Sequence, residues 1–169
     1  RQMCIRDRGA AEVHDYADAE TPKRIADAHP DIKHAFDTYS MNGSQETIAG
    51  ILTKEEENRI VSILSVDEAR VKQVNPKSKA TFLLLYTVYG KRTEIFGAVF
   101  EEDYCKQDAE YLPKLCSGKD GLFYKLLSSG VVKPNRTSVQ SGGFSGMFQG
   151  LDAMRQNKVS GEKLVYPHA

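Results

Sequence analysis

The chain has 169 residues, enough for one domain with a real core and too few for two ordinary ones. Basic residues (Lys and Arg) and acidic residues (Asp and Glu) both number 23, so the sequence lacks the basic excess typical of nucleic-acid-binding proteins. The apolar stretch at residues 81–90 is about half the length of a membrane-spanning helix. We therefore expect a cytoplasmic protein without nucleic-acid or membrane partners.

Three cysteines, Cys4, Cys105 and Cys116, are an odd number without C-x-x-C spacing, which indicates neither a zinc site nor a disulfide framework. No histidine has a partner at metal-ligand spacing, so no metal is expected. The sequence fits a reducing compartment.

The first eight residues, RQMCIRDR, show no helical or strand period, no cap and no signal-peptide core. They match the translation of a transposon-end sequencing adapter. We predict that residues 1–8 are an artefact without contacts to the core, and that the domain comprises residues 9–169. A short disordered basic tail is the alternative.

From residue 12 to residue 66, strand and helix patterns alternate. Strands are expected at residues 12–16, at 32–40 with Ala35 and Phe36 inward, and at 59–66, whose nearly continuous apolar run suits burial on both faces. Two helices separate them. Thr21 is expected to cap the first, which Pro30 ends, and Ser44 the second. The apolar face of the second helix would comprise Thr47, Ile48, Ile51 and Leu52.

This alternation predicts a parallel sheet covered by helices. Ligands of such sheets bind at the carboxyl ends of the strands, which here are residues 15–16, 37–40 and 64–66. The alternative is that these polar strand ends simply face water.

The second half of the chain has a different pattern. Residues 79–90 are apolar, and helices are expected at 101–115 and at 119–130, the latter closed by Gly130. An extended return at 131–139 precedes a glycine-punctuated helix at 141–161 and a closing strand at 162–166. The apolar stripe of the glycine-punctuated helix is expected to be core; it comprises Phe144, Met147, Phe148, Leu151 and Met154.

Four stretches carry a resemblance to a known family: GAAEVHDYADAETPKRIADAHPDIKHAFDTYS, LLLYTVYG, EEDY with FYKLLSSGVVKPN, and the tail GGFSGMFQGLDAMRQNKVSGEKLVY. In order and spacing they resemble the zinc-type medium-chain alcohol dehydrogenase and quinone oxidoreductase superfamily. The branch they resemble most is the fungal trans-acting enoyl reductases. The resemblance extends from residue 9 to about residue 166.

The resemblance implies an α/β fold: a partial Rossmann-like parallel sheet with flanking helices, lacking its first strands and the GroES-like domain. No G-x-G-x-x-G follows a predicted strand, so the pyrophosphate cradle, the zinc ligands and the usual catalytic side chains would lie upstream. The chain would be a C-terminal fragment, comprising part of the NADP-binding domain and a C-terminal return segment.

By resemblance, three places would contact NADP. Tyr16 would lie against the nucleotide, although it could equally cap the sheet edge. Ile63 and Leu64 would run beside the nicotinamide-side ribose, and Val159 and Ser160 would add a further contact. The acyl or enone pocket would be lined by Leu83, Leu84, Leu85, Tyr86 and Thr87, a segment that core packing explains equally well. No catalytic side chain and no metal ligand is expected within the chain.

The family's activity implies an NADP-dependent oxidoreductase that transfers a hydride from NADPH to an activated alkene or a carbonyl. Its partners would be a small enone, acyl or carbonyl substrate and, in the intact protein, a second copy or a megasynthase. We expect the chain alone to be inactive. The alternative is a non-catalytic, truncated Rossmann-like module that pairs its exposed sheet edge with a partner.

Overall fold

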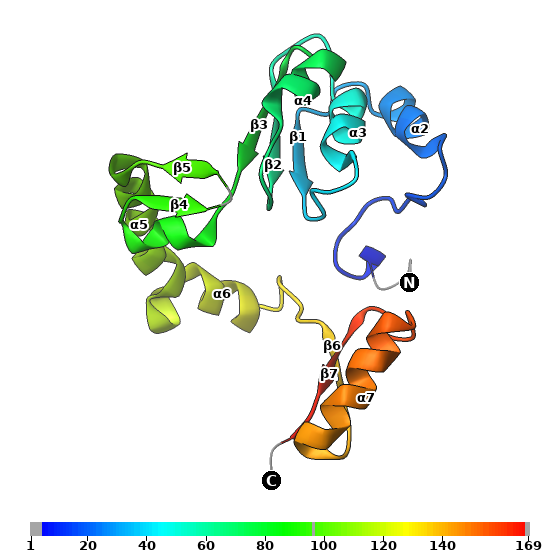
Figure 1. The fold of residues 1–169 in the computed structure, drawn as a ribbon, viewed down its shortest axis with the longest axis vertical. Coiled ribbons are helices and arrows are strands. Elements are labelled where there is room, and N and C mark those ends of the chain that lie inside the picture. Colours follow the sequence, from blue (N-terminus) through cyan, green and yellow to red (C-terminus); the bar gives the residue numbers. More distant parts are fainter. Residues whose placement is uncertain (1–4, 96, 168–169) are drawn as a thin grey trace. The chain divides into compact units, whose positions relative to one another are not determined.

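The computed structural model describes residues 5–95 and 97–167, which form two compact units (Figure 1). The sheet unit comprises His14–Ser117. The return unit comprises the described residues up to Val13 together with those from Gly118 onward.

The sheet unit is built on three parallel strands in the order β1 (His34–Asp37), β2 (Asn58–Ser62) and β3 (Ser78–Phe82). Helix α3 (Ser44–Ile51) connects β1 to β2, α4 (Glu68–Val74) connects β2 to β3, and α2 (Thr21–Ala28) packs beside α3. Parallel strands joined by helices confirm the α/β class that the sequence predicted.

The core lies on one face of this sheet. Ala35, Ile60 and Ala80 occupy one register row, and the helices pack on it through Ala49, Leu52 and Val71. Because side chains alternate along a strand, the next row, Phe36, Val61 and Thr81, points to the opposite face.

Two expectations about burial are therefore wrong. Phe36 is 60% exposed rather than inward, since its neighbour Ala35 takes the helix-covered face. Strand β2 is buried on one face only, because Arg59 and its row lie on the side that α3 and α4 leave open.

Two buried asparagines tie the amino ends of the strands to the ends of the helices. The Asn75 amide donates to the carbonyls of Ala49, Leu52 and Thr53, and Asn58 donates to Thr53 and accepts from Ser78. Carbonyls at the end of α3 that would otherwise be orphaned are thereby satisfied.

The predicted helices form, but not with the predicted caps. Glu20 rather than Thr21 is the N-cap of α2, and left-handed Gly43 rather than Ser44 is the N-cap of α3. Both hydroxyls bond the preceding strand or turn instead. The predicted apolar face of α3 is right in part: Leu52 is core and Ile48 packs against it, whereas Thr47 is exposed and Gln45 and Ala49 are buried.

Residues 12–16 form no strand; they are irregular and lead into the turns before α2. A strand requires a neighbour that pairs with its backbone groups, and the described chain places none beside this segment.

Beyond β3 the chain forms a compact lobe whose hairpin the sequence pattern did not reveal. The short helix η1 (Leu85–Tyr89) is followed by the antiparallel strands β4 (Thr93–Ile95) and β5 (Ala98–Phe100), and then by α5 (Glu102–Cys116), which packs on η1. The Phe100 ring packs at a tilt against Phe82 of β3 and against Tyr104 of α5.

The return unit contains η2 (Gly118–Asp120), α6 (Leu122–Ser128), β6 (Arg136–Val139), α7 (Gly143–Arg155) and β7 (Glu162–Val165). Strands β6 and β7 form a parallel pair, and Gly130 has φ 72° just after α6, as expected of a helix-ending glycine. These elements match the predicted return.

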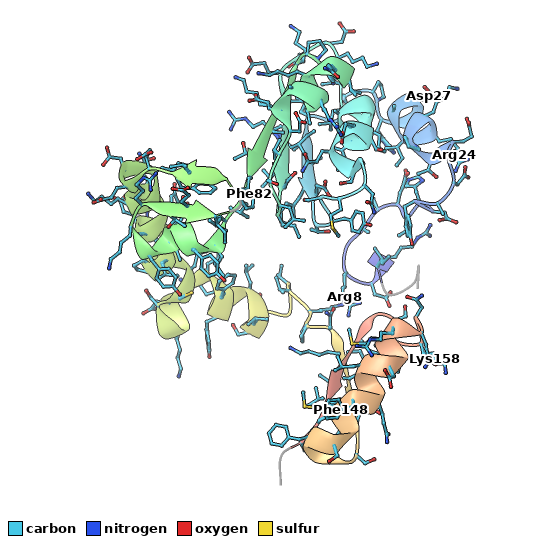
Figure 2. All side chains as sticks on the ribbon, viewed as in Figure 1. Arg8, Arg24, Asp27, Phe82, Phe148 and Lys158 are labelled. Atoms are coloured by element: carbon cyan, nitrogen blue, oxygen red, sulfur yellow. The ribbon has the colours of Figure 1, made fainter. Side chains whose placement is uncertain are left out.

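The apolar stripe of α7 is not core, contrary to the prediction. Its five residues are 44–72% exposed, and Phe148 is the most exposed of them (Figure 2). The buried residues of α7 are Gly146 and Gly150, because the Tyr166 ring after β7 lies directly against them. The Tyr166 ring packs so closely that only glycines fit beneath it. These glycines lie on the side of α7 opposite the apolar stripe.

Of the first eight residues, 1–4 lie outside the described residues. Residues 5 and 6 are helical and residues 7 and 8 form a turn. This exposed segment bonds an equally exposed loop: Arg8 donates to the Pro134 carbonyl, and Lys133 donates to the Asp7 carbonyl, each at 3.3 Å. These contacts do not reach a core. The adapter origin stays a prediction.

Candidate site at the carboxyl edge of the sheet

The carboxyl ends of the three parallel strands lie at one edge of the sheet, and two adjoining clefts lie beside the ends of β1, β2 and β3. We call this edge the carboxyl-edge site: residues 38–46 after β1, 63–67 after β2 and 83–87 after β3. One cleft of about 250 Å³ is lined by residues 40–46 and 65–67. The other, of about 310 Å³, is lined by Ser65, Val66, Phe82, Gly97 and Ala98. Ser65 and Val66 separate the two.

Asp37, at the end of β1, organises the first loop. Its side chain is 4% exposed and accepts hydrogen bonds from the backbone N–H groups of Tyr39 and Ser40 and from the Ser44 hydroxyl, at 2.6–3.0 Å. Three donors on one buried carboxylate satisfy most of its hydrogen-bonding capacity. The loop is therefore built before any ligand arrives.

Ser40 and Gln45 tie this first loop to the exit of β2. The Ser40 hydroxyl donates to the Asp37 carbonyl (2.8 Å) and accepts from the Ile63 N–H (3.1 Å). Gln45, at the start of α3, donates to the Ser65 carbonyl (3.1 Å). Ser40 has φ 55°, an uncommon conformation for a non-glycine residue, and these bonds hold it there.

The lining of the first cleft is neutral or acidic. It includes the carboxylates of Glu46 and Asp67, and the nearby Arg70 pairs with both, at 3.9 and 3.4 Å. Residues 40–46 and 65–67 contain no lysine or arginine. Such a lining suits hydroxyl and amide groups of a ligand and disfavours phosphate.

Two of the predicted cofactor residues, Ile63 and Leu64, lie at this site, directly after β2. Ile63 is 40% exposed, and its backbone N–H is already engaged by Ser40 and by the Asp37 carbonyl. Its exposed side chain is therefore the part that a ligand can reach.

The other predicted cofactor residues belong to other segments of the chain. Tyr16 is 93% exposed in the turns before α2. Val159 belongs to the return unit, where it lines a cleft of about 260 Å³ together with Lys158, Glu162 and Tyr166, and Ser160 follows it.

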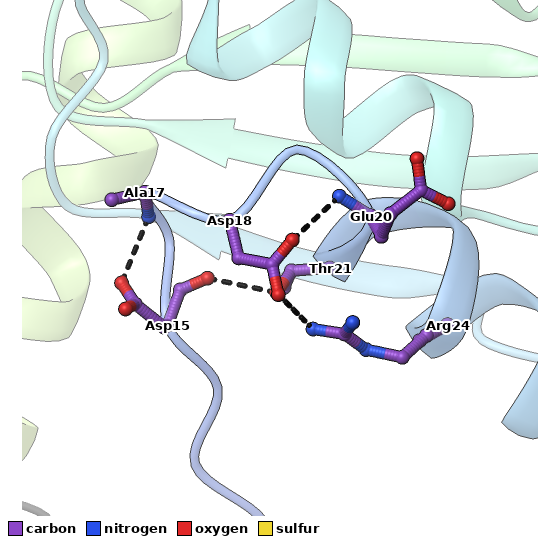
Figure 3. A network of polar contacts seen from close by, with 6 residues as sticks. All are labelled: Asp15, Ala17, Asp18, Glu20, Thr21 and Arg24. Carbon is purple, nitrogen blue, oxygen red and sulfur yellow. Dashed lines mark hydrogen bonds and ion pairs between the residues drawn. The ribbon is translucent and has the colours of Figure 1, made fainter.

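The turns around Tyr16 are held by a polar network (Figure 3). The Asp15 carboxylate accepts a hydrogen bond from the Ala17 N–H, and the Asp15 backbone carbonyl accepts one from the Thr21 hydroxyl. The Asp18 carboxylate accepts one from the Glu20 N–H. The Arg24 guanidinium, 2.7 Å from Asp18, holds the pKa of that carboxyl below its usual value, and the bond from the Glu20 N–H acts in the same direction.

The predicted substrate segment follows β3 at the same edge. Leu83, Leu85 and Tyr86 are 50%, 74% and 52% exposed, and Leu84 is half-buried. Thr87 differs, because it is 1% exposed and its hydroxyl bonds Asp108 of α5. The segment thus offers apolar surface and one phenol, while its threonine faces inward.

The sequence pattern did not predict some residues of the site. Gly97 and Ala98 line the second cleft, and the only signal for them was a glycine between apolar residues in IFGAV. Within residues 5–95 and 97–167 no group of three or more metal-ligating side chains gathers, and no helix there is long and apolar enough to cross a membrane.

Comparison with protein-family models gives no match. Among curated proteins, the chain is 28% identical over 159 residues to trans-enoyl reductase caaB of Aspergillus niger, covering 94% of this chain and 42% of that protein. It is 30% identical over 164 residues to trans-enoyl reductase resD of Aspergillus sclerotiorum, covering 94% of this chain and 43% of that protein. The chain thus spans less than half the length of these relatives.

Solved structures give the same fold. The CurF ER cyclopropanase of the curacin A biosynthetic pathway superposes with a TM-score of 0.62 over 98% of this chain and 44% of its own, at 13% identity. The CurK enoyl reductase gives 0.57 over 96% and 43%, at 15% identity. The predicted resemblance to the fungal trans-acting enoyl reductases is confirmed, and with it the partial Rossmann-like fold.

Proposed function

We propose that this chain is the C-terminal part of an NADPH-dependent, trans-acting enoyl reductase of the medium-chain class, and that it is inactive by itself. The observation that carries the proposal is the meeting of the predicted nicotinamide and substrate segments, residues 63–64 and 83–87, at one edge of the sheet. The relatedness to trans-enoyl reductases supports the same reaction.

The residues at this edge fit one end of NADPH. The neutral and acidic lining of the first cleft suits the nicotinamide amide and the ribose hydroxyls. These groups can donate hydrogen bonds to the carboxylates of Glu46 and Asp67. Gly43 and Gly97 leave open space where a Cβ would stand, so a flat ring can approach the backbone there. The phosphates, which are usually paired with cations, would be held by residues outside this chain, because residues 40–46 and 65–67 contain no lysine or arginine.

When bound, the cofactor supplies a hydride to the β-carbon of an enoyl substrate, while a proton adds to the α-carbon. This chain's residues would bind and orient the two reactants. Leu83, Leu85 and Tyr86 offer apolar surface for the acyl chain, and Ile63 lies on the neighbouring strand end. The carbonyl oxygen that gathers charge would be served by groups outside the chain.

The partners of the intact protein are proposed from the same relationship: an enone, acyl or carbonyl substrate, delivered by a megasynthase or bound by a homodimer. A cytoplasmic location is part of the proposal.

Activity of the purified chain is the first test. With NADPH and an enoyl thioester, we expect no NADPH consumption above the protein-free rate. Steady turnover at an ordinary enzymatic rate, about 1 s⁻¹ or faster, would show that the chain is a complete enzyme.

The reading frame upstream of residue 9 in the source DNA is the second test. A GroES-like domain and a strand followed by a glycine-rich turn are expected there. An unrelated upstream frame, together with a stable dimer that ignores NADPH in light scattering, would favour the non-catalytic module.

A further inference from the structure

Thr87 carries a buried hydroxyl with two acceptors. Its Oγ1 lies 2.7 Å from the Leu84 carbonyl oxygen and 2.5 Å from Oδ2 of Asp108. A threonine hydroxyl has one hydrogen, and these two acceptors compete for it. No proton is left for a substrate carbonyl, and the 1% exposure of Thr87 excludes direct contact.

The bond to Asp108 joins two elements that are otherwise joined by packing. Thr87 is the middle residue of η1, and Asp108 lies two turns into α5. The next residue of α5, Ala109, lies against Gly90, where an added Cβ would come within 3.3 Å of it. Helix α5 thus contacts both the middle of η1, through a hydrogen bond, and its end, through packing.

These contacts with α5 determine which side chains of residues 83–87 face outward. With Thr87 turned inward, its neighbours Leu85 and Tyr86 are 74% and 52% exposed, and Leu83 is 50% exposed on the strand exit. The Asp108 carboxylate is also close enough to α5's Tyr104 to raise the pKa of that phenol, after burial, which is the larger cause. Asp108 is therefore a half-buried carboxyl group that lies beside the Thr87 hydroxyl and near the Tyr104 phenol.

We propose that Asp108 is a positioning residue, which through Thr87 fixes residues 83–86 in the conformation that receives the acyl chain of the substrate. The inference rests on the proposed function. The half-burial of Asp108 costs its carboxylate part of its solvation. Valine in place of Thr87 and alanine in place of Asp108 would join η1 and α5 without that cost, so the polar pair is not needed for packing. A directional hydrogen bond fixes one conformation of the segment, which packing alone does less sharply.

Thr87→Val in the full chain tests this, since valine keeps the shape and removes the hydroxyl. Thr87→Ser keeps the hydroxyl, and Thr81→Val, on an exposed position of β3, is the matched control. Two quantities are measured by NMR: amide hydrogen exchange at residues 84–90 relative to 58–62, and the affinity for crotonyl-pantetheine from shifts at residues 83–86.

In Thr87→Val we expect exchange at residues 84–90 to accelerate about tenfold or more, and crotonyl-pantetheine affinity to fall by a similar factor. Thr87→Ser and Thr81→Val should change neither by more than about twofold. If Thr87→Val does not fold, Asp108→Ala, which removes the acceptor of the Thr87 hydroxyl, is measured in its place, with the same direction expected in both quantities.

The inference is overturned if Thr87→Val leaves exchange unchanged, or accelerates it without weakening the probe. It is also overturned if the unmodified chain shows no probe shifts at residues 83–86. Failure of the proposed function is seen separately, with NADPH, as the absence of shifts at residues 40–46 and 65–67.

Discussion

Asp37 shows how a single carboxylate shapes the carboxyl-edge site. It is almost fully buried, yet it lies at a strand end where a ligand edge is expected, and its three hydrogen bonds all serve the loop that lines the first cleft. Its role is therefore to hold the loop rather than to react with a ligand.

Asp37→Asn should destabilise the sheet unit by about 1–3 kcal/mol, because the amide cannot accept all three bonds and its NH₂ faces donors. Urea denaturation followed by NMR measures this. Asp27→Asn is the control, since Asp27 forms an exposed pair with Lys23 and its loss should cost less than about 0.5 kcal/mol. Equal effects of the two substitutions would contradict the role given to Asp37.

Asp18 makes the start of α2 sensitive to pH. Its pKa is lowered by Arg24 and by the Glu20 N–H, so its stabilising contribution is present above the ordinary carboxyl pKa and is lost as the pH falls through the lowered value. We expect the Cα shifts of α2 to move toward coil between about pH 5 and about pH 2. Asp18→Asn should reduce that change, and Asp27→Asn should not. An unaltered acid transition in Asp18→Asn would refute this.

At the scale of elements, α7 and β7 depend on two glycines. A Cβ on Gly150 would lie 2.1 Å from the Tyr166 hydroxyl oxygen and 2.9 Å from the ring carbon that bears it. Real Cβ atoms do not approach so closely, so the ring or the helix must move.

Gly150→Ala should therefore destabilise the α7–β7 pair by about 1–3 kcal/mol, although alanine gains about 1 kcal/mol in helix propensity. Amide exchange of β7 measures the effect. Gln149→Ala, on the exposed neighbouring position, should be neutral or slightly stabilising. A Gly150→Ala chain as protected as the unmodified one would show that Tyr166 does not pack as described.

The sequence predicted which elements form better than which sides they bury. Helices α2, α3, α5, α6 and α7 and strands β1, β2 and β7 followed from prolines, glycines and apolar runs, whereas α4 and the order of the strands were not predicted. Burial did not follow for Phe36 or for the α7 stripe, because it depends on partners that lie outside the local pattern. In α7, the side that is buried is the one that carries Gly146 and Gly150, because the Tyr166 ring packs against it. Residues 12–16 had strand propensity but no neighbour to pair with.

The same holds for the carboxyl-edge site. Residues 37–40 and 64–66 were predicted as strand ends that face a ligand; β1 ends at Asp37 and β2 already at Ser62, and both segments contribute to the lining of the first cleft, whereas the third predicted end, residues 15–16, belongs to no strand. The inward turn of Thr87 and the contribution of Gly97 and Ala98 depended on α5 and the β4–β5 hairpin packing against β3. No sequence spacing encodes those contacts.

At the scale of the whole molecule, burial is distributed unevenly. The sheet unit has an apolar core of Ala49, Leu52, Ile60 and Val71. Among the described residues of the return unit, only glycines are fully buried, and the stripe of α7 is exposed. The chain spans 42–43% of the length of the trans-enoyl reductases that it matches, and together with these exposed surfaces this is the reason we propose inactivity for the chain alone.

A titration of the ¹⁵N-labelled chain with NADPH, followed by two-dimensional NMR, tests whether the carboxyl-edge site binds the nicotinamide end of the cofactor. We expect weak binding, with a dissociation constant of about 1 mM because the phosphates lack their site, and shifts centred on residues 40–46 and 65–67. Adenosine 2′,5′-bisphosphate, which carries phosphates and no nicotinamide, should not shift those residues. NADPH that leaves them unshifted up to about 10 mM, or that shifts them no more than the bisphosphate does, would contradict the account.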